Sequence, residues 1–303
     1  MKIFFSPEYV ASSVNFDTTR KAQWIRDSLL GNPIEGVEIS NPQLVPISSI
    51  LAIHDRGYVK SVQDGTPRHL AESSGFPWNQ NVWKMVLAST SGQIAAVKAA
   101  LSEGVAGSLS SGCHHARREQ GKGFCTFNGL AIAAHELSRL GRSNVLILDL
   151  DAHCGGGTHS IVQSMPWVTH VDVSVSPGGA LGAVFDSYTP SHQNGNVLVL
   201  VNNAEEYIPT IVRNLELLND LPFDFCLYNA GMDPYEKCHI GGLRGITRAI
   251  LEERERIVFD YFSKRNIPIS FIPAGGYINE NFAQCELVDL HRLTLEAAKR
   301  AYS

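Results

Sequence analysis

The chain has 303 residues, of which 44% are hydrophobic and 18% charged, and its formal net charge is −5. This length and composition exclude a disordered chain and can supply a sizeable core. The negative balance provides no basic surface for nucleic acid, and no apolar run is long enough to span a membrane.

Strand-like and helix-like segments alternate along the chain. Apolar runs typical of strands lie at residues 2–6, 144–151, 167–176, 196–201, 223–231 and 267–276. Stretches with helical spacing lie at residues 19–31, 81–104, 129–141, 207–220 and 246–266. This alternation predicts an α/β fold with a single open, mostly parallel sheet and helices on both faces. Ligands in such folds bind at the carboxyl ends of the strands, so the site is expected there.

We expect a single domain over residues 1–303, because no linker-like segment divides the chain convincingly. The Gly/Ser-rich stretch at residues 104–112 is the best candidate boundary, although a functional loop explains it equally well.

The opening segment MKIFFSPEYV has a short apolar patch that Pro7 and Glu8 interrupt, so it predicts a first strand rather than a signal peptide. The six cysteines form no CxxC pair. Both features favour reduced thiols in the cytoplasm and argue against a zinc site built from cysteines.

Two adjacent histidines, His114 and His115, stand in a glycine-bounded loop before a predicted helix. Partly exposed loop histidines are common, and that is the ordinary explanation of the pair. Beside a metal centre, the same residues could serve as general acid and base, since neutral imidazole titrates near working pH.

The segment LILDLDAHCGGG places Asp149, Asp151 and His153 at alternate positions where a strand ends. Alternate residues share one face of an extended chain, so the three side chains can point the same way. A helix cap or a core histidine would explain any one of them. Three together favour a divalent ion such as zinc. Asp233 follows a later strand and could complete an open three-ligand site, although Asp-Pro ordinarily begins a turn.

Tyr277 directly follows two glycines at the end of another predicted strand. The glycines let the backbone approach a ligand closely. A phenol at this place could stabilise a developing oxyanion, whereas a tyrosine that packs on a turn is the ordinary alternative.

Taken in order, the motifs GCHHA, GFCTFN, DLDAHCGGGT, AGMD and GGY resemble the metal-dependent deacetylase family, which includes histone deacetylases and acetylpolyamine amidohydrolases. The resemblance implies an arginase/deacetylase-like fold and a zinc-dependent deacetylase acting on linear amide bonds. A mixed oxygen and nitrogen ligand set also accepts Fe²⁺.

The resemblance implies a role for each matching residue. The metal ligands would be Asp151, His153 and Asp233. The catalytic residues would be His114, His115, Tyr277 and, as the partner of the first histidine, Asp149. The acyl channel would be lined by Gly123 and Phe124. A structural K⁺ or Na⁺ would be held by Asp149, Asp151, His153, Ser174 and Val175.

The sequence departs from the family pattern at several positions. Cys113 replaces a glycine before the histidine pair, Cys154 replaces a second histidine, and residues 174–187 lack the usual aromatic-Pro-Gly loop. Gly156 stands where an Asp or Asn commonly supports the second tandem histidine. Without that side-chain partner, His115 is expected to titrate at a lower pH than in relatives that keep it.

Two other functions remain open. An arginase-like ureohydrolase with two manganese ions would need another Asp where this chain has Gly155, and it would leave the tandem histidines unexplained. A catalytically idle acyl-amine binding protein is supported only by Cys154 and Gly156.

The expected partner is an acylated amine, as a small molecule or in a peptide. Acetyl-lysine, an acetylpolyamine and a small metabolite amide all fit. No nucleic-acid or membrane partner is expected. A homo-oligomer stays open, and it matters because a neighbouring subunit could narrow the channel.

Overall fold

The computed structural model describes residues 1–10, 16–176, 184–191 and 195–303. Its eight strands form one sheet in the order β2-β1-β3-β8-β7-β4-β5-β6. Every strand pairing in the described part of the chain is parallel. The predicted α/β fold is therefore confirmed, and its sheet is more uniform than the mostly parallel one expected.

The strands are β1 (Lys2–Phe4), β2 (Glu38–Ser40), β3 (Val105–Ser108), β4 (Val145–Asp149), β5 (Val168–Val175), β6 (Val197–Val201), β7 (Phe225–Gly231) and β8 (Ile269–Ala274). The helices are α1 (Asp17–Gly31), α2 (Ile47–Leu51), α3 (Arg56–Asp64), α4 (Arg68–Ala71), α5 (Gln80–Glu103), α6 (Gly129–Arg139), α7 (Gly156–Val162), α8 (Ala204–Leu217), α9 (Arg248–Lys264) and α10 (Gln284–Ala301), and η1 (Pro7–Tyr9) is a short 3₁₀ turn.

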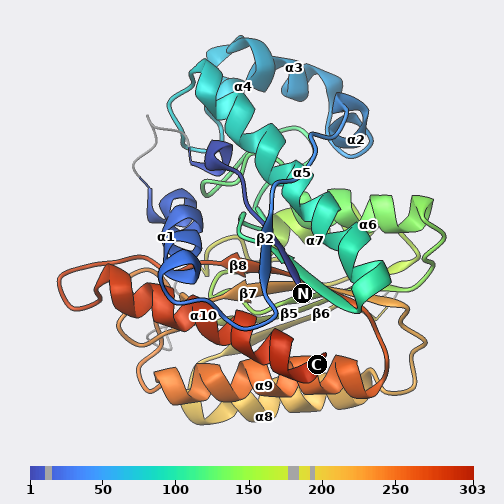
Figure 1. Ribbon diagram of the computed structural model, residues 1–303. Helices are drawn as coiled ribbons and strands as arrows, with labels where there is room; N and C mark the ends of the chain where they lie inside the picture. The colour runs from blue at the N-terminus through green and yellow to red at the C-terminus, as the bar shows by residue number, and fades with distance from the viewer. Residues whose placement is uncertain (11–15, 177–183, 192–194) are drawn as a thin grey trace.

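Helices cover both faces of the sheet, as Figure 1 shows, with α8, α9 and α10 on one side and α5, α6 and α7 on the other. Each face has its own apolar core. In β4, Leu146 and Leu148 pack in the core with α8, α9 and α10, whereas Val145 and Ile147 pack in the opposite core. Burial on both faces explains why the predicted strands are continuous apolar runs.

The segment at residues 104–112 contains strand β3 in the interior of the sheet, and Ser111 and Gly112 beyond the strand line a pocket together with His114 and His115. Its small residues result from crowding. A Cβ atom on Gly107 would lie only 2.6 Å from the ring of Phe271 on the adjacent strand β8. The edge strand β2, with three residues, also went unpredicted.

Among the described residues, no helix combines the length and the apolar composition that crossing a bilayer requires.

A buried ion pair stabilises the end of β7. The guanidinium of Arg254 on α9 lies 2.6 Å from the carboxylate of Glu255, and both side chains are 0% exposed. Arg254 also donates to the carbonyl of Gly231, the last residue of β7, at 2.7 Å, and to the hydroxyl of Tyr207 at 3.0 Å. Because Asp233 follows β7 directly, this arginine supports the backbone that leads to it.

Replacing Arg254 with leucine is expected to lower the free energy of unfolding by about 3–5 kcal/mol, because Glu255 would remain as a buried and unpaired charge. Arg256→Leu is the control, since Arg256 lies on the same helix and pairs with Asp260 at the surface. Chemical denaturation of the two variants tests this. A loss below about 1 kcal/mol for Arg254→Leu would contradict the role given to the pair.

Candidate active site

The polar residues predicted to form the site converge at the carboxyl ends of neighbouring strands. Asp149 ends β4, and the chain continues from it to Asp151 and His153. Asp233 follows β7, which pairs with β4, and Tyr277 follows β8, which pairs with the other edge of β7. Residues far apart in sequence are thus brought to one edge of the sheet, as the parallel topology requires.

The three predicted metal ligands lie around a common point. One possible ligand atom from each of Asp151, His153 and Asp233 lies within 4.8 Å of the other two. His153 Nδ1 is 3.1 Å from Asp151 Oδ1 and 3.0 Å from Asp233 Oδ2. Two atoms bound to a tetrahedral Zn²⁺ at about 2.0–2.1 Å lie roughly 3.3 Å apart. The donor types and their spacing therefore fit such an ion.

Glycines allow this close approach. A Cβ atom on Gly275, which has a φ of +53°, would lie 2.3 Å from the carboxyl carbon of Asp233. A Cβ atom on Gly231 would lie 2.4 Å from the Cα atom of Asp151. Larger residues at these positions would push the two carboxylates apart.

The carboxylates of Asp151 and Asp233 are both buried and lie close together, which favours binding of a cation between them. Burial and the neighbouring charge of Asp151 raise the pKa of Asp233 to about 6. Burial opposes ionisation of Asp151 as well, but the charge of His114 and hydrogen bonding from His153 outweigh it and hold its pKa below the ordinary value. A bound divalent ion would neutralise both carboxylates.

His114 is paired with Asp149 as predicted. Its Nδ1 atom lies 2.8 Å from Asp149 Oδ2, and the amide of Asn229 donates to Asp149 Oδ1 at 2.8 Å. Burial alone would lower the pKa of His114, but the charges of Asp149 and Asp151 outweigh it and raise this pKa to about 10. His114 is therefore cationic near neutral pH.

The prediction that His115 lacks a side-chain partner is wrong. Its Nδ1 atom lies 3.2 Å from Oδ2 of Asp186, a residue far along the chain from the predicted position at Gly156. The pKa of His115 is still lowered, to about 4, because burial and the charge of His114 outweigh the effect of Asp186. The imidazole of His115 is therefore uncharged near neutral pH.

The two predicted channel residues lie in different pockets. Gly123 lines a small pocket with His114, His115 and Tyr277. The ring of Phe124 instead packs on Phe16 and Phe76, with a centroid distance of 3.9 Å to Phe16. Phe124 is not among the residues that line the pocket of the histidines.

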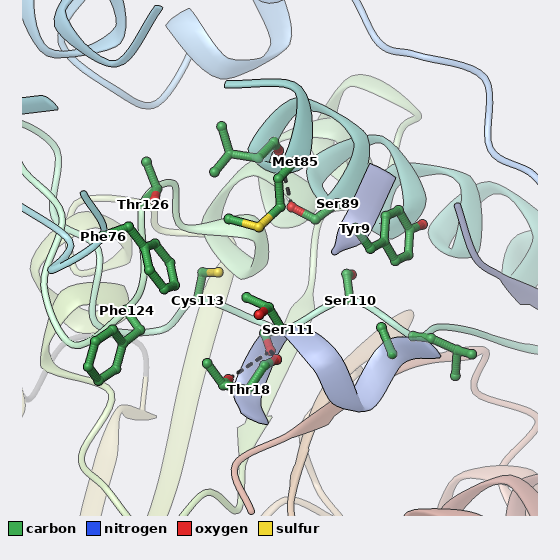
Figure 2. Close-up of a pocket in the computed structure, with 14 residues that line it drawn as sticks. Tyr9, Thr18, Phe76, Met85, Ser89, Ser110, Ser111, Cys113, Phe124 and Thr126 are labelled. Carbon is green, nitrogen blue, oxygen red and sulfur yellow. Dashed lines mark hydrogen bonds between the residues drawn. The ribbon is translucent and has the colours of Figure 1, made fainter. Parts of the chain in front are cut away.

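Phe124 and Phe76 line the second pocket, which Figure 2 shows. The two pockets share Thr18, Ser111 and Cys113 in their linings, so these three residues separate the histidine pocket from the second pocket.

Phe185 is the aromatic residue that meets the second histidine. Its ring packs edge-on against the ring of His115 at a centroid distance of 4.7 Å. A Cβ atom built on Gly123 would lie 2.9 Å from the Phe185 ring, so the ring also lies against this glycine. Residues 177–183, half of the segment that lacks the usual aromatic-Pro-Gly loop, lie outside the described residues. Phe185 belongs to the described end of the same segment.

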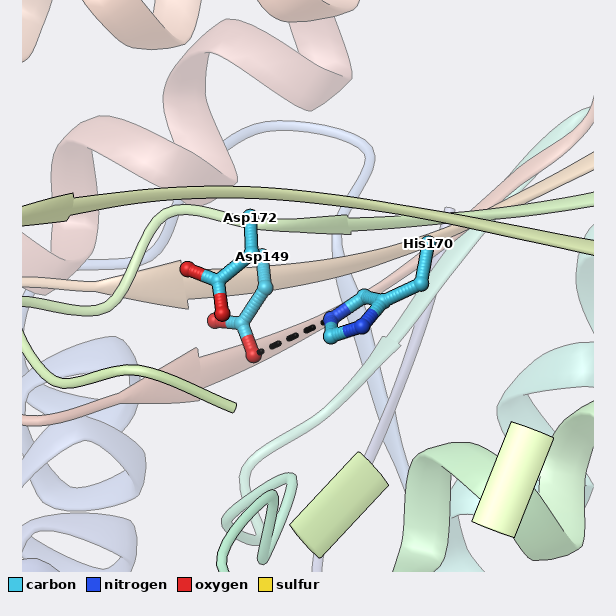
Figure 3. Close-up of side chains that lie close together, drawn as sticks. All are labelled: Asp149, His170 and Asp172. Atoms are coloured by element: carbon cyan, nitrogen blue, oxygen red, sulfur yellow. Dashed lines mark ion pairs between the residues drawn. The ribbon is translucent and has the colours of Figure 1, made fainter. Parts of the chain in front are cut away.

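Of the residues predicted to hold K⁺ or Na⁺, Asp149 ends β4, Ser174 and Val175 end β5, and Asp151 and His153 follow β4. The two strands are adjacent, and Asp149 pairs with Asp172 in register. The hydroxyl of Ser174 donates to Asp172 Oδ1 at 2.5 Å. Asp149, His170 and Asp172 form a second buried cluster with metal-binding side chains, shown in Figure 3. Both carboxylates already accept hydrogen bonds there, from Asn229 and Ser174 among others.

Sequence reasoning missed several residues of this region. His170, Asp172 and Ser174 stand at alternate positions in the buried strand β5, and that pattern was a usable signal. Lys21 carried none. It is fully buried beneath the GGY turn, donates to the carbonyl of Gly275 at 3.2 Å, and has a pKa lowered to about 8 by burial.

Fold and site together define a parallel α/β protein with an Asp-His-Asp centre, a histidine pair and a tyrosine at one sheet edge. Comparison with known families agrees with this description, because residues 16–292 match the histone deacetylase domain. The chain belongs to the histone deacetylase family.

Individual relatives span nearly the whole chain. An uncharacterised protein of Picosynechococcus sp. is 30% identical over 277 residues, which cover 89% of this chain and 87% of that protein. Histone deacetylase 2 of Arabidopsis thaliana is 26% identical over 280 residues, which cover 88% of this chain and 70% of that protein. The crystal structure of acetylpolyamine aminohydrolase from Burkholderia pseudomallei has the same fold, with a TM-score of 0.80 at 18% identity over 98% of each chain.

Proposed function

We propose that this chain is a metal-dependent amidohydrolase that removes an acetyl or short acyl group from an amine. The observation that carries the proposal is the convergence of Asp151, His153 and Asp233 beside the pocket lined by His114, His115 and Tyr277. Zn²⁺ is the proposed ion, and Fe²⁺ suits the same donors. Similarity to a histone deacetylase and to an acetylpolyamine aminohydrolase supports deacetylation as the reaction class.

The side chains of the pocket divide the work of amide hydrolysis. When bound, a divalent metal polarises the amide carbonyl and lowers the pKa of water. Neutral His115 would accept the proton of the attacking water and later deliver it to the leaving amine. Cationic His114, held by Asp149, would stabilise negative charge. The phenol of Tyr277 stays protonated, because burial and nearby carboxylates raise its pKa, and would donate to the oxyanion.

The proposed substrate is a small molecule or peptide that carries an acylated amine, and neither nucleic acid nor a membrane is a proposed partner. A structural K⁺ or Na⁺ near Asp149 and Ser174 is part of the proposal. The cysteines of the described chain are free thiols, which suits the cytoplasm as the proposed location.

A screen of acylated amines with metal-defined protein tests the function. We expect release of acetate from an acetyl-lysine peptide or an acetylpolyamine, loss of turnover to background after chelation, and recovery when Zn²⁺ is added back. Silence of the zinc-loaded protein over many acyl-amines, with binding retained, would instead favour the idle acyl-amine binding protein.

A further inference from the structure

The carboxylate that holds His115 comes from a turn outside the sequence motifs of the site. We propose that Asp186 is the positioning residue for His115, an inference that rests on the proposed function. Asp186 Oδ2 lies 3.2 Å from His115 Nδ1 and accepts the backbone N–H of Gly157 at 3.0 Å. The Asp186 side chain is 0% exposed, so water cannot replace it freely as the partner of His115.

The charge of Asp186 is balanced by two cations that reach it from the histidine loop. Its Oδ1 atom accepts from Arg117 at 2.5 Å and from Lys122 at 2.6 Å. Burial opposes ionisation, but hydrogen bonds from His115 and Lys122 and the charge of Arg117 lower the pKa of Asp186 to about 2. The hydrogen bonds of the Asp186 carboxylate therefore join it to one histidine, one backbone amide and two positively charged side chains.

Gly156 provides the space in which Asp186 sits. A Cβ atom built on Gly156 would lie 2.2 Å from the carbonyl oxygen of Asp186 and 3.0 Å from its carboxyl carbon. A side chain at position 156 and the observed seat of Asp186 thus exclude each other. Because position 156 has no side chain, the carboxylate of Asp186 has room to reach His115.

The contact dictates which nitrogen of His115 faces the pocket. With Nδ1–H donated to Asp186, the ring presents the lone pair of Nε2 as its free basic site. The same turn restrains the ring from a second direction, because Phe185 packs edge-on against it and Lys122 lies 4.8 Å from the centre of the Phe185 ring. Asp186 and Phe185 together fix both the tautomer and the plane of the imidazole.

The test compares Asp186→Ala with Asp186→Asn, and Ser187→Ala serves as the matched control on the exposed side of the same turn. Long-range ¹H–¹⁵N spectra of the metal-free proteins report the His115 tautomer, with His115→Gln used for assignment. We expect the Nδ1–H form in the wild type, in Ser187→Ala and in Asp186→Asn, whose amide oxygen still accepts the bond. Asp186→Ala should lose this preference.

Kinetics of the metal-loaded proteins give the second measurement. Asp186→Ala should lower kcat by about 10- to 100-fold with little change in KM, and Asp186→Asn should recover part of that loss. Because the spectra need no turnover, a wild type without any activity would count against the proposed function alone and leave the positioning role measurable.

Gly156→Ala covers the case in which Asp186→Ala does not fold, because it displaces the Asp186 turn and leaves the carboxylate chemically intact. It should reproduce the change of tautomer. An unchanged His115 tautomer in Gly156→Ala and in any folded Asp186→Ala protein would overturn the inference.

Discussion

Replacing Asp233 with asparagine is expected to reduce metal binding and to lower turnover by more than about a hundredfold. The substitution keeps the shape of the side chain but removes one of the two carboxylates that face His153. Mutation of a residue that only hydrogen-bonds to a metal ligand typically lowers metal affinity or activity by about 10- to 100-fold. Removing the charge of a ligand itself should therefore have a larger effect. Metal content by elemental analysis and acetate release measure the two effects.

Asp220→Asn is the control, because Asp220 is an exposed aspartate away from the strand ends and should leave both quantities unchanged. If Asp233→Asn retained one tightly bound metal ion per chain and full turnover, the assignment of the ligand set would be wrong.

In the metal-free protein, the effect of Asp233→Asn on the free energy of unfolding is expected to depend on pH. Burial and the charge of Asp151 raise the pKa of Asp233 from 3.8 to about 6, so ionisation of this group favours the unfolded chain. Its contribution to stability is present at low pH and is lost as the pH rises from about 4 through about 6. Asparagine cannot ionise. The difference in unfolding free energy should therefore shift in favour of Asp233→Asn across that window, as measured by denaturation at several pH values.

Replacing Tyr277 with phenylalanine is expected to lower kcat by about 10²- to 10³-fold, the usual cost of removing one oxyanion donor. Tyr277 lines the pocket together with His114, His115 and Asp151, and its phenol remains protonated near neutral pH. Because the hydroxyl is proposed to act mainly in the transition state, KM and the metal content should change little.

Tyr261→Phe supplies the comparison for this loss, since the hydroxyl of Tyr261 bonds to Asn219 at the surface. Steady-state kinetics on the best acyl-amine substrate would decide the matter. A Tyr277→Phe enzyme within about threefold of the wild type in kcat would remove the phenol from the mechanism.

The parts of the fold and site that follow local rules could be predicted from the sequence. The apolar runs predict β4 and β7 as strands of a parallel sheet. Strand geometry then predicts that Asp149, Asp151 and His153, at alternate positions, point the same way. The rule that parallel strands end at one edge then brings Asp233 and Tyr277 to the same place.

The parts that depend on tertiary contacts could not be predicted. Asp186 meets His115 across 71 residues of sequence, and nothing in its local segment marks it as a partner. Lys21 lies at helical spacing from the buried residues Ile25 and Leu29 of α1, but a lysine at such a position ordinarily extends its charged end to solvent. Strand β3 has a glycine at position 107 because Phe271 occupies the space that a side chain there would need, and this weakens its strand-like pattern.

The position of β8 has a consequence for how the chain reaches its native state. It is the last strand in sequence, yet it lies in the interior of the sheet, between β3 and β7. Until residues 269–274 have been synthesised, a nascent chain cannot join the β2-β1-β3 portion to the β7-β4-β5-β6 portion, and each portion has an unpaired edge. The active site lies across this junction, so the chain gains its catalytic geometry only in a late step, which long-range strand pairing makes intrinsically slow.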